Sequence, residues 1–141
     1  MKIFHFYIFN RKNECLFYRA WDREEVSQSL DSETKNIAGL LYTLRQLLNE
    51  LSPKESARFE SFATDTYRLH YLKPLSGFSF LLFTEPGARS LQTQLKHIYK
   101  DIFIELVIKN PLYTVGDKIE LESFRNTLDD YISETKKLKE I

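Results

Sequence analysis

Two short runs in this 141-residue chain are almost continuously apolar, IFHFYIF at residues 3–9 and FSFLLF at residues 78–83. Each is far shorter than the ~20 residues that cross a membrane as a helix. A strand with one buried face alternates apolar and polar residues, whereas an unbroken apolar run is typical of a strand covered on both faces. We therefore expect a sheet whose central strands lie between two layers of helices.

Three weaker strand patterns accompany these runs. Residues 15–21 follow the first run across a polar turn and predict a hairpin with it. Phe59 and Phe62 mark a third strand, and residues 67–71 alternate in a fourth. If the strands are numbered along the chain, placing the two continuous runs in the middle with hairpins outward predicts the order 2-1-5-4-3.

Three segments supply the helices. Residues 33–51 repeat leucine and isoleucine at helical spacing and end at Ser52-Pro53; residues 90–109 and 118–138 follow the last strand. Ser90 is expected to be the N-cap of the first of these two helices. Asp117 and Glu120 have capping-box spacing at the start of the second. The prediction is one α/β (α+β) domain over residues 1–141, with one helix on one face of the sheet and two on the other.

The segment IYKDIFIELVIKNPLYTVGD, residues 98–117, is more apolar than a helix on one sheet requires. The stripe expected to face the sheet is Leu91, Leu95, Ile98, Ile102 and Leu106. Four further apolar residues lie outside that stripe: Phe103, Ile104, Val107 and Ile108. A helix that is apolar nearly all round is buried nearly all round. We expect these four, with Asn110 and Pro111 at the helix end, to contact a partner, and Glu105 to lie at a wet margin or to pair with a cation.

Charge and cysteine content exclude several function classes. Lys plus Arg and Asp plus Glu are 20 each, so the net charge is +0, and no long-range field attracts nucleic acid or an anionic membrane. The apolar start lacks the small residues of a signal-peptide cleavage site. A single cysteine fits a reducing compartment such as the cytosol. We expect no nucleic-acid partner, no direct membrane insertion and a cytoplasmic location.

The residues that carry chemistry are scattered. His5, His70 and His97 lack metal-ligand spacing, and Cys15 has no second cysteine with which to hold zinc. The four glycines form no phosphate-binding loop. We therefore expect no catalytic residue, no metal and no cofactor; an enzyme that uses Cys15 as nucleophile is the alternative from another class.

The back of the 33–51 helix has a composition that interfaces favour. It presents Ala38, Tyr42, Arg45 and Asn49. Tyrosine and arginine are enriched in protein contacts, which predicts a partner surface here; a tyrosine lying on its own helix is the alternative. Trp21, where the hairpin ends, is either an interface anchor or a rim residue.

Several segments resemble the sybindin-type small core subunits of the transport protein particle (TRAPP), whose fold is longin-like. They are FYIFNR with YRAW, LLYTLRQLLNELSP, FATDTYRLHYLKPLSGFSFLLFTE and HIYKDIFIELVIKNPLYTVGD. The last is the most specific, because a helix running into Asn110-Pro111 is characteristic of this group.

The resemblance implies a non-catalytic subunit of a hetero-oligomeric tethering complex that acts between the endoplasmic reticulum and the Golgi apparatus. Its implied partners are other TRAPP small subunits and, through the assembly, a Rab-type GTPase whose nucleotide exchange the complex promotes. It also implies a peripheral location at both membranes. Small clathrin-adaptor chains begin similarly, so a longin-like coat subunit is the alternative.

Overall fold

A computed structural model describes residues 2–12, 14–21, 39, 42–43, 46, 61–63, 65, 67–74 and 76–137. Five strands form one antiparallel sheet of order β2-β1-β5-β4-β3, as predicted. They are β1 Ile3–Phe9, β2 Cys15–Ala20, β3 Ser61–Ala63, β4 Arg68–Leu72 and β5 Ser79–Thr84. Because β3 has only 3 residues, the four longer strands carry most of the sheet.

The central strands are buried on both faces, as their unbroken apolar runs predicted. Along β1, Phe6 and Ile8 join one hydrophobic cluster, whereas the alternating Tyr7 and Phe9 join a second cluster. Successive side chains of a strand point to opposite faces, so the two clusters lie on the two sides of the sheet. All six residues of β5 are buried in the same way.

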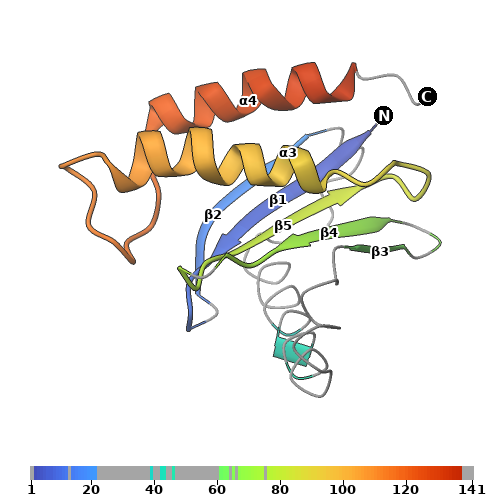
Figure 1. Ribbon diagram of the computed structural model, residues 1–141, viewed down its shortest axis with the longest axis horizontal. Helices are drawn as coiled ribbons and strands as arrows, with labels where there is room; N and C mark the ends of the chain where they lie inside the picture. The colour runs from blue at the N-terminus through green and yellow to red at the C-terminus, as the bar shows by residue number, and fades with distance from the viewer. Residues whose placement is uncertain are drawn as a thin grey trace.

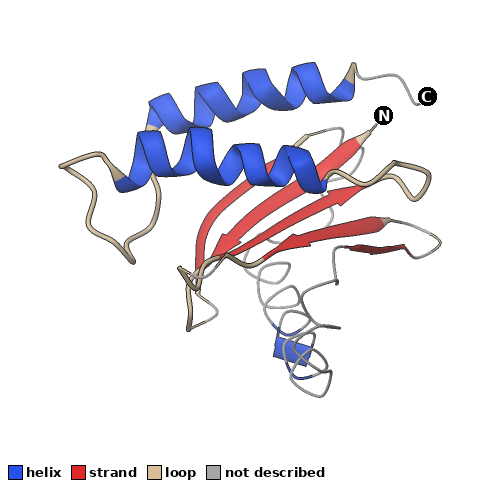
Figure 2. Cartoon of the chain, viewed as in Figure 1, coloured by secondary structure: helices blue, strands red, loops and turns tan. Residues whose placement is uncertain are grey.

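Two helical segments cover one of these faces (Figure 1). The first is α3 Gln92–His97, which runs on into the π-helix η1 Ile98–Ile108, and the second is α4 Glu122–Lys136. Figure 2 shows both above the strands, which confirms the predicted two-helix layer. The predicted 33–51 helix and the loop before it lie outside the described residues, except that 39, 42, 43 and 46 are helical.

Neither predicted helix cap forms. Helix α3 follows Leu91 rather than Ser90, because Leu91 is buried and its backbone N–H donates to His70 Nδ1 at 3.3 Å. His70 thus satisfies the Leu91 amide just before the helix, and no side chain caps the first turn of α3.

Helix α4 follows Leu121, so the Asp117/Glu120 capping box was wrong as well. Before the helix, the Ile119 backbone N–H donates to the Leu16 carbonyl oxygen of β2 at 2.8 Å, and the Ile119 side chain is buried. This contact holds residues near 119 against the edge of the sheet, and the helix starts only after it. None of the helices among the described residues is long and apolar enough to span a membrane.

Candidate partner interface

The helix of residues 98–108 is wound more widely than an α-helix. It is a π-helix over its full length, and at its end the Lys109 N–H donates to the Ile104 carbonyl five residues earlier, at 2.9 Å. Bonds from residue i to i+5 place more residues in each turn than the 3.6 of an α-helix. The buried face therefore recurs at intervals of four and five, and comprises Ile98, Ile102, Phe103 and Val107.

This winding corrects the partner surface predicted for the helix. Phe103 and Val107 are 0% exposed and belong to the core, so they cannot contact a partner. The Phe103 ring lies 5.2 Å from Phe78 and 5.3 Å from Phe80, between centroids, in edge-to-face geometry. Leu106, predicted to face the sheet, is only half-buried instead. The sequence prediction assumed the 3.6-residue period of an α-helix and therefore placed these side chains on the wrong faces of the helix.

The remaining candidates on this helix lie at its margin. Ile104 and Ile108 are half-buried and pack against the core cluster while keeping exposed surface. Glu105 is exposed and pairs with Lys109, whose ammonium donates to Oε1 at 2.8 Å. The prediction that Glu105 lies at a wet margin or is paired with a cation is confirmed in both respects.

Asn110 and Pro111 end the helix and begin a loop. The Asn110 side-chain Oδ1 accepts a hydrogen bond from the Leu112 N–H at 2.9 Å, which is an Asx turn. Pro111 is exposed and Asn110 is half-buried. Both retain surface that a partner could cover, so their assignment to an interface stays a prediction.

Of the four residues predicted on the back of the first helix, the structure describes only Tyr42. Its side chain is 57% exposed, and its hydroxyl accepts a hydrogen bond from Gln46 Nε2 at 2.9 Å, one turn along the helix. Tyr42 therefore lies partly along its own helix, and the larger part of its side-chain surface is still exposed to solvent. Ala38, Arg45 and Asn49 lie outside the described residues.

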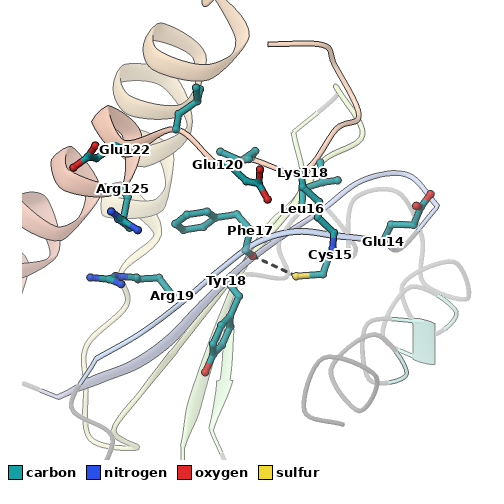
Figure 3. A pocket seen from close by; sticks show the side chains of 12 residues that line it. Glu14, Cys15, Leu16, Phe17, Tyr18, Arg19, Lys118, Glu120, Glu122 and Arg125 are labelled. Atoms are coloured by element: carbon teal, nitrogen blue, oxygen red, sulfur yellow. Dashed lines mark hydrogen bonds between the residues drawn. The ribbon is translucent and has the colours of Figure 1, made fainter. Parts of the chain in front are cut away.

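A groove of about 830 Å³ follows the edge strand β2 (Figure 3). Arg19 and Arg125 lie toward one end, and Glu14 and Cys15 lie toward the other. Cys15 Sγ donates to the Phe17 carbonyl at 3.4 Å, and burial raises the pKa of the thiol. No histidine is among the described residues that line this groove. Among the described residues, Cys15 therefore has neither the lowered pKa nor the neighbouring histidine that is typical of a cysteine nucleophile.

His70 holds the start of α3 against the sheet. Since Nδ1 accepts the Leu91 amide, Nε2 carries the proton and donates to Thr84 Oγ1 at 2.9 Å; that hydroxyl donates to the Glu85 carbonyl at 3.2 Å. Burial, with a smaller effect of the Arg68 charge, lowers the pKa of His70 to about 4. His70 is thus a neutral structural residue. Among the described residues, no group of three or more His, Cys, Asp or Glu side chains could hold a metal ion.

Asp129 of α4 is a structural residue that sequence reasoning missed. Its carboxylate accepts two hydrogen bonds from Arg19, at 3.0 and 2.8 Å, and one from Trp21 Nε1 at 3.0 Å. Trp21 is half-buried, and its indole N–H is bonded within the chain. Asp129 lies 110 positions after Arg19 and 108 after Trp21, so no local pattern pairs it with them.

The chain thus combines an antiparallel sheet whose central strands are buried on both faces, a two-helix layer and half-buried apolar positions at the helix margin, an arrangement compatible with the longin-like fold. Comparison with known proteins identifies its family. The chain belongs to the Sybindin-like family, whose family model matches residues 3–135. The family predicted from the quoted segments is confirmed.

Three relatives cover nearly the whole chain. Trafficking protein particle complex subunit 1 of Dictyostelium discoideum is 36% identical over 94% of this chain and 95% of that protein. The human protein of the same name is 33% identical over 94% and 92%. Transport protein particle subunit bet5 of Schizosaccharomyces pombe is 31% identical over 94% and 96%.

Proposed function

We propose that this chain is a non-catalytic core subunit of the TRAPP tethering complex, at the position of subunit 1. One observation carries the proposal: proteins named for that subunit are 33–36% identical to this chain over 94% of its length. The half-buried thiol with a raised pKa and the neutral, fully bonded His70 fit a subunit that supplies surface rather than chemistry.

In this role the chain contributes to assembly and to the surface at which the complex promotes nucleotide exchange on a Rab-type GTPase. Its direct partners are other TRAPP small subunits, and its place is cytoplasmic, on the surfaces of the endoplasmic reticulum and the Golgi apparatus during vesicle transport. The family match favours this role over a clathrin-adaptor chain.

The contact residues proposed for these partners lie on two elements. The first group is Ala38, Tyr42, Arg45 and Asn49. The second is Ile104, Ile108, Asn110 and Pro111, at the margin and end of η1. Phe103 and Val107 leave the set because the core buries them.

Affinity purification of the tagged chain from cells, followed by cross-linking mass spectrometry, tests the proposal. We expect other TRAPP small subunits, with cross-links to lysines close to η1 such as Lys109. Recovery of adaptor chains in place of TRAPP subunits would overturn it.

A further inference from the structure

The loop between η1 and α4 exposes two large apolar side chains. Leu112 is 90% exposed and Val115 is 64% exposed. Among the residues that the structure describes, Tyr42 is the one other large apolar side chain so exposed. Leu112 and Val115 therefore concentrate apolar surface on one short segment at the end of the molecule.

This loop is held in one shape by its own hydrogen bonds. The Tyr113 N–H donates to the Asn110 carbonyl at 3.1 Å, the Asp117 N–H donates to the Thr114 carbonyl at 3.1 Å, and the Tyr113 hydroxyl donates to the Asp117 carbonyl at 2.6 Å. Gly116, with φ of 100°, takes a left-handed conformation that other residues rarely adopt. Such a preformed loop loses little conformational freedom when a partner covers it.

A hollow of about 490 Å³ lies beside the loop, where it meets two turns of the sheet. The described residues that line it come from the β1–β2 turn, the β4–β5 turn and the loop itself. Val115 and Phe78 supply apolar lining, while Lys12 and Asp117 bring opposite charges. The hollow is therefore suited to an apolar side chain surrounded by polar and charged contacts.

The charges indicate what kind of partner would fit. An anionic membrane is attracted by clusters of Lys and Arg, but Glu14 and Asp117 lie in the lining together with Arg11 and Lys12. Protein interfaces, in contrast, combine an apolar centre with a rim that carries both signs. The loop also continues directly along the chain from Ile108 and Asn110, which belong to the partner surface proposed above.

We propose that the 110–117 loop and this hollow form the docking site of a folded neighbouring protein subunit. The partner covers Leu112 and places an apolar side chain in the hollow against Phe78 and Val115, with a carboxylate facing Lys12. This inference rests on the proposed function, since it assigns a further contact within the same assembly.

The test uses the full-length chain and purified TRAPP small subunits, and it measures pairwise affinity and entry into the reconstituted particle. Leu112→Asp combined with Val115→Asp should weaken one pairwise contact by on the order of 10- to 100-fold, because each change places a charge in an apolar contact. Asn126→Asp combined with Thr127→Asp, at two exposed positions of α4 outside the loop and the hollow, is the matched control and should bind within a few-fold of wild type. Lys12→Glu should weaken the same contact and reduce its sensitivity to salt.

A photoreactive amino acid at position 115 gives a second readout that does not depend on the double variant's folding. With liposomes of endoplasmic-reticulum composition present, it should capture one protein subunit. Capture of lipid, of a second copy of this chain or of nothing would overturn the docking site. Wild-type entry into the particle with unchanged affinity of the double variant would overturn the docking site and leave the proposed function standing. Failure of the wild-type chain to enter the particle would overturn both.

Discussion

At the scale of single residues, Asp129 joins the last helix to the edge of the sheet. Its carboxylate accepts a bidentate pair from Arg19 and a third bond from Trp21. The Arg19 and Asp129 side chains are 39% and 28% exposed, so water screens much of their attraction. We therefore expect the three hydrogen bonds that Asp129 accepts to contribute more to stability than its charge does.

We predict that Asp129→Ala lowers the free energy of unfolding by about 1–2 kcal/mol, because two half-buried donors lose their acceptor. Denaturant unfolding measures this change. Asp130→Ala, at the exposed next position of α4, is the control and should change stability by less than about 0.5 kcal/mol. Equal effects of the two substitutions would contradict the role given to Asp129.

His70 makes the stability of the fold depend on pH, and the direction of this dependence follows from its lowered pKa. The folded-state pKa of about 4 lies below the ordinary value of 6.5, so between these values the unfolded chain binds more protons than the folded chain. The stability linked to His70 is therefore complete above about pH 6.5 and is lost as the pH falls toward about 4.

We predict that protonation linked to His70 costs about 3 kcal/mol of stability over that range. Urea unfolding should show the gap between the wild-type chain and His70→Gln narrowing as the pH falls from about 7 to about 4. Thr93→Gln, at an exposed and non-titratable position of α3, is the control and should keep the wild-type profile. A gap independent of pH would show that His70 is not held neutral.

At the scale of elements, the π-helix decides which residues form the core. Under α-helical winding Leu106 would continue the stripe of Ile98 and Ile102, and Phe103 would lie on its flank. Under the observed i→i+5 winding Phe103 is fully buried and Leu106 only partly so. Substitutions at these two positions distinguish the windings.

We predict that Phe103→Ala costs about 3–5 kcal/mol of unfolding free energy, because it leaves a cavity among Phe78, Phe80 and Phe124. Leu106→Ala should cost about 1 kcal/mol or less, since its side chain is already partly exposed. Thermal or urea unfolding of both variants checks the order. The reverse order would indicate regular α-helical winding.

The sheet was the most predictable element and the helix ends were the least. The unbroken apolar runs at residues 3–9 and 78–83 indicate which two strands are central. If neighbouring strands are then joined by hairpins, one simple strand order remains. The cap at Leu91 depends on His70, 21 positions earlier, and the late start of α4 depends on a bond from Ile119 to Leu16. Partners so far apart in the chain cannot be predicted from the local spacing of residues. The change from α-helical to π-helical winding cannot be predicted from that spacing either.

At the scale of the whole molecule, the candidate partner surfaces lie on separate parts of the fold. The short helical piece drawn in teal, which includes residues 42 and 43, lies on the side of the sheet away from α3 and α4, whereas the loop between η1 and α4 lies at one end of the helical layer (Figure 1). Tyr42 and its helix neighbours were predicted from composition, while Leu112 and Val115 emerged only from their exposure. A chain whose surfaces point in different directions can contact more than one neighbour.

We predict that Tyr42→Ala with Arg45→Glu weakens assembly, by on the order of 2 kcal/mol if these are anchor residues, and leaves the fold intact. Co-purification of TRAPP subunits measures assembly, and a thermal melt measures the fold. Thr43→Ala, an exposed neighbour of Tyr42, is the control. Unchanged co-purification by the double variant would show that this face is ordinary solvent surface.

The central proposal is that this chain lends the complex surface rather than chemistry, and the nucleotide-exchange rate that we propose for the complex, on a Rab-type GTPase, tests it most directly. A reconstituted particle carrying Glu105→Gln or Cys15→Ala should keep that rate within a few-fold, because among the described residues Glu105 pairs with an exposed lysine and Cys15 donates to a backbone carbonyl, which are structural contacts. Ile104→Asp should instead reduce assembly. A hundredfold loss of exchange from Glu105→Gln or Cys15→Ala, in a particle that is fully assembled, would contradict the account.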